Sequence, residues 1–104
     1  MIKIENGLVA VKDLKAHPLN EKLYPFKEHK NTIEVLSEKL YNEFKATKIP
    51  NHTPLDVCPE TGTVNSGHFR WYASQEMKDD KGNIIKATHL KAVPGRVFNP
   101  DYVE

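Results

Sequence analysis

The segment that most constrains the fold is an amphipathic helix in the first half of the chain, because the remaining elements must cover its apolar face. Apolar side chains recur there at the spacing of one helix face, namely at Ile33, Leu36, Leu40 and Phe44. Asn31, with Glu34 three residues later, has the pattern of a capping box. We therefore predict a core helix from Thr32 to Ala46.

The other regular segments are shorter. Strand patterns occur at 2–4, 8–11, 55–58, 63–65, 84–85 and 90–93, with Asn6-Gly7 and residues 59–62 as turns between neighbouring strands. A second helix is predicted from His68 to Met77, followed by a polar turn at 79–83. Residues 13–30 and 48–54 are expected to be loops, the former with at most one helical turn. This order predicts one α+β domain over residues 1–104, with a small mixed sheet and two main helices, a core at 8–98 and a tail at 99–104.

Length and composition exclude several classes of protein. With 104 residues, the chain has room for one small domain and not for a complete methyltransferase or Rossmann dehydrogenase. No apolar run or signal-type core is found, so we expect neither a membrane association nor secretion. The single cysteine, Cys58, cannot form an internal disulfide, and we expect it to lie in the core. The lack of a disulfide pair predicts a reducing compartment, the cytoplasm. The net charge of +1 allows duplex DNA only weak binding through a local patch.

The candidate site is the junction at which a strand ends in Asn65-Ser66-Gly67 and a helix begins at His68. Glycine permits a tight turn, and the first N–H groups of a helix lack internal partners and favour an anion. His68 and Arg70 lie in that first turn and would add donors, His68 gaining charge below its usual pKa of about 6.5. The junction predicts a phosphate site. The alternative is that Ser66 caps the helix and Gly67 only makes the turn.

Several segments together resemble the ParB/sulfiredoxin-like N-terminal domains. Residues 9–20 are similar to the family's strand, acid-leucine and His-Pro-x-Asn opening, and residues 33–44 to its amphipathic helix. Residues 53–57 resemble its x-Pro-x-x-Val strand, and residues 66–73 its Gly-[Glu/His]-x-Arg-x-x-Ala box. The segments occur in the family's order across residues 8–77. The form Ser-Gly-His-x-Arg is most similar to ParB-like modules that precede DNA methyltransferases, many of them from phages.

The resemblance implies a pocket for a nucleoside triphosphate, ATP or CTP, with or without magnesium. The spacing of the histidines and the single cysteine predict no metal site of the chain's own. The residues that the resemblance implies for phosphate and nucleotide binding are Ser66, Gly67, His68, Phe69, Arg70, His17, Asn20 and Thr53. His17 and Asn20 would close over the phosphates and Thr53 would lie near the base or sugar. It also implies a role in DNA modification or processing. The compartment would be the cytoplasm, which is the host's cytoplasm if the gene belongs to a phage. A homodimer stays open.

Departures from the family limit the activity. His68 replaces the reactive cysteine of the sulfiredoxins, and the arginine pair and DNA-binding domain of partition ParB proteins are missing. The free-serine kinases of the superfamily have an aspartate before the glycine of the box, where this chain has Ser66. A small ATP-dependent phosphotransferase or nucleotide hydrolase, with Glu21 as general base, stays open as an alternative, as does a non-catalytic interaction module. An exposed surface acid is the simpler interpretation of Glu21.

Overall fold

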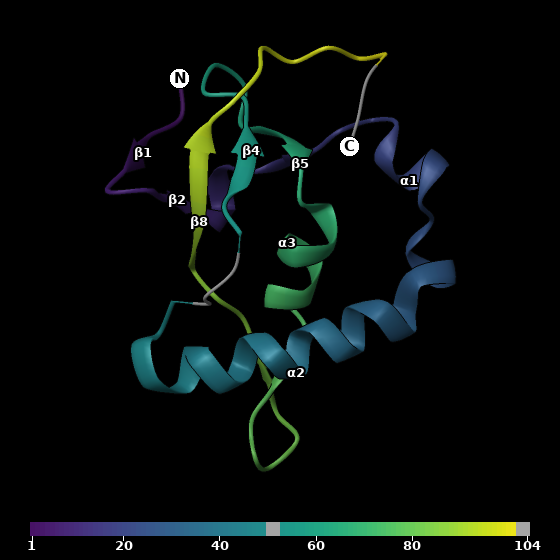
Figure 1. Ribbon diagram of the computed structural model, residues 1–104, viewed down its shortest axis with the longest axis vertical. Helices are drawn as coiled ribbons and strands as arrows, with labels where there is room; N and C mark the ends of the chain where they lie inside the picture. The colour runs from purple at the N-terminus through teal and green to yellow at the C-terminus, as the bar shows by residue number, and fades with distance from the viewer. Residues whose placement is uncertain (50–52, 102–104) are drawn as a thin grey trace.

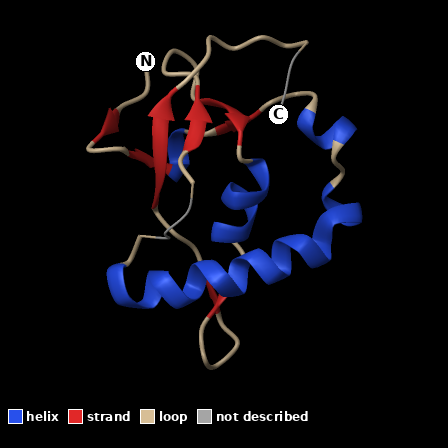
Figure 2. Ribbon diagram, in the orientation of Figure 1, coloured by secondary structure: helices blue, strands red, loops and turns tan. Residues whose placement is uncertain are grey.

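The computed structural model describes residues 1–49 and 53–101 and confirms an α+β protein with a mixed sheet. The sheet has six strands in the order β1-β2-β8-β4-β5-β3, and a second, two-stranded sheet is formed by β6 and β7. The helix α3 (His68–Ser74) lies between the larger sheet and the long helix α2 (Lys30–Thr47; Figure 2). No helix of the described residues is both long and apolar enough to cross a membrane.

The first strands form the hairpin that the Asn6-Gly7 pair predicts. β1 (Ile4–Glu5) and β2 (Leu8–Ala10) are antiparallel, with Ile4 opposite Val9. Asn6 and Gly7 both have positive φ, at 54° and 74°, as a two-residue turn of the primed type requires. The hairpin is the edge of the larger sheet.

The remaining strands of the large sheet place the site at one end of it. β8 (His89–Pro94) is antiparallel to β2 and parallel to β4 (Leu55–Val57). β4 is antiparallel to β5 (Thr63–Ser66), as predicted, and β5 is parallel to the two-residue edge strand β3 (Lys15–Ala16). β5 ends at Ser66, directly before the junction that the sequence selects.

The long helix α2 (Lys30–Thr47) runs across the molecule below α3 (Figure 1). Ile33, Leu40 and Phe44 are buried as predicted, whereas Leu36 is only partly buried. The capping-box prediction is wrong, because the helix begins at Lys30 and no side chain caps it. The 3-10 turn η2 (Phe26–His29) leads directly into α2, so its carbonyls can accept bonds from the first N–H groups of the helix.

α3 (His68–Ser74) begins at the predicted residue but ends before Met77. The carbonyl of Ser74 accepts a hydrogen bond from the Ala87 N–H (3.0 Å), which takes the chain out of the helical pattern. Met77 instead belongs to β6 (Met77–Lys78), which is antiparallel to β7 (Ile84–Ile85). The polar turn between these strands is confirmed, with Asp79 Oδ1 accepting bonds from the N–H groups of Lys81 and Asn83.

The segment at 13–30 is more ordered than a loop with one helical turn. It contains, in chain order, the end of η1 (Val11–Asp13), β3, the one-turn helix α1 (Asn20–Leu23) and η2. A two-residue strand has no alternation that a sequence pattern can reveal, which explains the omission of β3. The predicted loop at 48–54 includes residues 50–52, which lie outside the described residues.

The core lies between α2, α3 and the large sheet. Its fully buried members include Ile33 of α2, Leu55 and Val57 of β4, and Leu90 of β8. Cys58, directly after β4, is buried as predicted. Trp71 and Phe69 are partly buried and pack against the core.

Candidate functional site

A cavity of about 320 Å³ opens between α1 and the first turn of α3, a volume within the range of small-molecule sites. Two of its lining residues, Ser66 and Gly67, are at the junction where β5 passes into α3, and Figure 1 shows how the chain runs there. Its lining comprises Asn20, Tyr24, Ser66, Gly67, His68, Phe69 and Arg70. The strand–glycine–helix junction and the upstream Asn20 therefore meet in one cavity.

Gly67 gives the junction its shape. Its φ of 103° is in the left-handed region that other residues avoid. A Cβ at this position would come within 2.5 Å of Leu55 Cδ2 and 2.6 Å of a terminal nitrogen of Arg70. The guanidinium of Arg70 therefore lies close over the glycine, in space that any side chain at residue 67 would take.

The hydrogen bonds of His68 fix which ring nitrogen carries its proton. The backbone N–H of His17 donates to His68 Nε2 over 3.1 Å, so Nε2 is an acceptor. In a neutral imidazole the proton must then be on Nδ1. Nδ1 is buried and has no hydrogen-bond partner among the described residues. His68, a lining residue of the cavity, therefore carries a buried ring N–H donor that has no partner among the described residues.

The expected charge on His68 below pH 6.5 is corrected by the structure. Burial of the ring, with a smaller contribution from His17, lowers the pKa of His68 to about 4. Only 2% of the residue is exposed, so the charged form would be poorly solvated. His68 is therefore a neutral donor throughout the physiological range of pH.

Arg70 supplies the second unpaired donor. Its Nε is buried and has no hydrogen-bond partner among the described residues. Burial lowers the pKa of Arg70 from its usual value, yet a guanidinium stays charged at neutral pH. α3 has only 7 residues, so the side-chain donors, rather than the dipole of a long helix, determine the character of the site.

The other predicted site residues are divided by the structure. Asn20 lines the cavity, and its amide donates to the Tyr72 hydroxyl over 3.1 Å. His17 is buried beside His68 and holds it through the backbone. Thr53 and Glu21 are exposed and do not line the cavity. Both carboxylate oxygens of Glu21 accept from the Phe26 N–H, at 3.2 and 3.3 Å, which places Glu21 at the start of η2.

Tyr24 is a lining residue that the sequence analysis missed. It follows α1 directly, and its N–H donates to the carbonyl of Asn20 over 2.7 Å. Its ring meets that of Phe69 edge to face, with 6.3 Å between centroids, and the ring of His29 lies 4.8 Å from that of Phe69. The only available signal is an aromatic residue four positions after Asn20, and it has meaning only once α1 is known to form.

Comparisons with protein-family models, with curated proteins and with solved structures found no match to this chain. The resemblance to the ParB/sulfiredoxin-like domains therefore rests on the sequence motifs alone.

Proposed function

We propose that the chain binds a nucleotide, with its phosphates between His68 and Arg70. The observation that carries the proposal is that Nδ1 of His68 and Nε of Arg70 are both buried N–H donors without a hydrogen-bond partner among the described residues. An unpaired buried donor costs about 1–3 kcal/mol, and an anion that accepts from both would remove that cost. The charge of the guanidinium favours the phosphate further.

The aromatic residues on the wall favour a nucleotide over a simple phosphate ester. Tyr24 and Phe69 place ring surface on the same cavity as the donors, and Tyr24 is 40% exposed. A purine or pyrimidine stacked there would bury ring surface that the protein leaves in contact with solvent. A nucleoside triphosphate, ATP or CTP, combines such a ring with the anionic groups that the donors accept.

Binding rather than catalysis is the proposed activity. Among the described residues that line the cavity there is no carboxylate, and Glu21 is occupied at η2. His68 Nε2 already accepts the His17 N–H and Nδ1 carries the proton, so neither ring nitrogen has a free lone pair for a general base. On the resemblance, we place this binding in the modification or processing of DNA in the cytoplasm, as the N-terminal module of a phage methyltransferase.

The test is a titration of ATP, CTP, GTP, UTP and inorganic tripolyphosphate, with and without magnesium, against wild type and matched variants. Arg70→Ala should weaken binding of all these ligands by roughly tenfold to a hundredfold, the loss of a charged contact of about 1.5–3 kcal/mol. Arg70→Lys should restore part of it, because the ammonium lacks the planar fork. Lys22→Ala, which removes one exposed charge on α1, is the control for general electrostatics.

Two variants in the same titration separate the base from the phosphates. Tyr24→Ala should lower the affinity for the nucleotides and leave the affinity for tripolyphosphate unchanged. Leu23→Ala, at an exposed neighbour outside the cavity, should change neither affinity. Equal affinities of wild type and Arg70→Ala, both folded by circular dichroism, would refute the phosphate site. A merely structural Arg70 would lower the melting temperature alone.

A further inference from the structure

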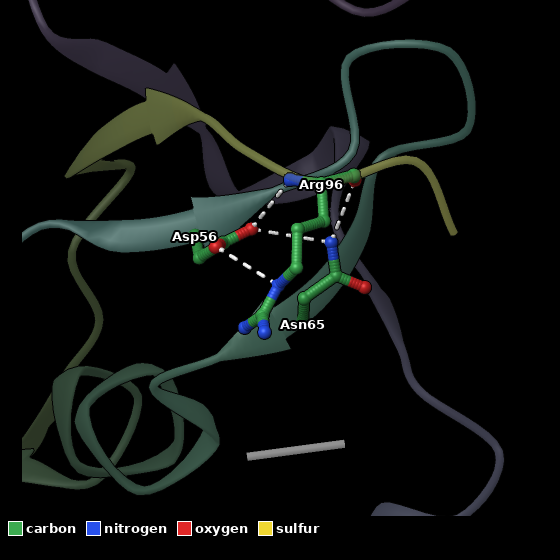
Figure 3. Close-up of polar contacts among 3 residues, drawn as sticks. All are labelled: Asp56, Asn65 and Arg96. Carbon is green, nitrogen blue, oxygen red and sulfur yellow. Dashed lines mark hydrogen bonds and ion pairs between the residues drawn. The ribbon is translucent and has the colours of Figure 1, made fainter. Parts of the chain in front are cut away.

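The chain after β8 forms a strap, residues 95–101, that crosses the ends of β4 and β5 toward α1 (Figure 1). Its first residues are fixed to the sheet, since the Gly95 N–H donates to the Val57 carbonyl over 2.8 Å. Asp56 accepts from the Arg96 N–H and pairs with its guanidinium, and the amide of Asn65 donates to the Arg96 carbonyl (Figure 3). The start of the strap is thus held by several polar contacts.

The far end of the strap is held mainly through His17. The carbonyl of Asn99 accepts from His17 Nε2 over 2.6 Å, and the ring of Phe98 lies 5.2 Å from the imidazole. The Phe98 backbone also lies near the buried thiol of Cys58 and contributes to lowering its pKa. His17 is 1% exposed, although Asn99 beside it and Val97 earlier in the strap are exposed.

These contacts fix the geometry of His17 and, through it, that of His68. His17 Nδ1 accepts from the Leu19 N–H over 3.2 Å, so Nε2 must carry the proton that Asn99 accepts. With its ring held in this way, His17 directs its backbone N–H at His68 Nε2. If the strap detaches, that N–H is free to move away, and the neutral ring of His68 can carry its proton on either nitrogen. The tautomer with the proton on Nε2 would present a lone pair to the cavity and repel an anion.

We infer that the strap controls the donor of the cavity, with Phe98 as a positioning residue that acts through His17 on the tautomer of His68. The inference rests on the proposed function, because it concerns the regulation of the same cavity. Anion binding and strap docking are then coupled. An anion in the cavity raises the equilibrium constant for docking of the strap, and release of the strap lowers the affinity for the anion by the same factor. Any partner that draws residues 95–101 off the sheet would lower the affinity of the cavity for its ligand.

The experiment compares Phe98→Ala with Val97→Ala, a matched truncation at the neighbouring strap residue, which is 72% exposed. Nitrogen-15 spectra of the ligand-free protein report which ring nitrogen of His68 carries the proton. The rate at which a thiol reagent labels Cys58 reports opening of the strap. A titration with tripolyphosphate measures the affinity for an anion, which depends on the N–H donor of His68. Phe98→Ala should shift the His68 proton from Nδ1 toward Nε2 and accelerate the labelling of Cys58. It should also lower the affinity for tripolyphosphate about tenfold, which is near the effect of losing one hydrogen bond to a charged group.

Val97→Ala should leave all three readouts at their wild-type values, and tripolyphosphate should slow the labelling of wild-type Cys58. If Phe98→Ala does not fold, Phe98→Leu, which keeps the apolar volume without the ring, takes its place. A folded variant with an unchanged His68 tautomer overturns the inference, whether or not labelling is faster. Wild type that fails to bind tripolyphosphate refutes the proposed function instead, and the tautomer comparison, made without ligand, still decides the role of the strap.

Discussion

His68 is a buried neutral histidine whose folded-state pKa of about 4 lies below its ordinary value of 6.5. The unfolded chain therefore binds a proton more readily than the folded one between these values, and His68 destabilises the fold as the pH falls through that window. From pH 7 to pH 5 we expect a loss of about 2 kcal/mol in the free energy of unfolding from this residue. Below pH 4 its contribution levels off, because both states are then protonated.

Urea denaturation of wild type and His68→Asn at several pH values measures this contribution. Asparagine places an amide donor near the position of Nδ1 but does not titrate, so its stability should fall less steeply below pH 6.5. Carboxylates titrate in both proteins, which is why the difference between the two curves, rather than either curve, carries the information. Parallel curves over the whole range would show that His68 is not the group responsible.

At the scale of single residues, the sequence selected several residues that line one cavity, but it did not give their protonation states or contacts. Gly67, His68 and Arg70 follow from the strand–glycine–helix pattern, and the cavity does lie there. The tautomer of His68 depends on a backbone N–H 51 residues earlier in the chain, and no local pattern carries that contact. The sequence did not predict Tyr24 as a lining residue for the same reason. Tyr24 reaches the cavity only because α1 turns the chain toward it.

Among the elements, α2 packs extensively against α3 and so supports the helix on which the site is built. Ile33 of α2 is 1% exposed and belongs to the hydrophobic core. Ile33→Ala should lower the free energy of unfolding by about 2–5 kcal/mol, from lost burial and an incompletely filled cavity. Val35→Ala, two residues along on the exposed face, should stay within about 0.5 kcal/mol of wild type in the same urea titration. A similar cost for both would contradict the assigned helix faces.

Elements with strong local signals were predictable, and those set by distant partners were not. The Asn6-Gly7 hairpin and the return from β4 to β5 follow from turn residues, and α2 follows from its periodicity. The end of α3 is set by a bond between Ser74 and Ala87, and β3 exists because β5 lies beside it. In both cases the decisive partner is far along the chain, where propensity carries no information.

For the molecule as a whole, the distribution of charge bears on DNA. The basic residues of the C-terminal third do not form one patch, because Lys78 lies on the β6–β7 hairpin while Lys91 lies on β8 of the other sheet. That hairpin extends on the far side of α2 from the strap (Figure 1). Arg96 pairs with Asp56, so part of its charge is already compensated. The net charge of +1 adds no general attraction.

Duplex DNA should therefore bind weakly to this chain and only at low salt. With few phosphates neutralised at once, the affinity should fall with salt along a shallow slope, close to 0.9 per phosphate contact in a double-logarithmic plot. Fluorescence anisotropy of a labelled duplex between about 20 and 200 mM salt measures that slope. Excess tripolyphosphate provides the control, because it should displace a strand that inserts a phosphate between His68 and Arg70 and leave surface binding by the lysines unchanged at constant ionic strength. Tight, sequence-dependent binding near physiological salt would mean that residues on separate elements act together on the duplex, and the dispersed charge distribution would then be the wrong basis for judging DNA as a partner.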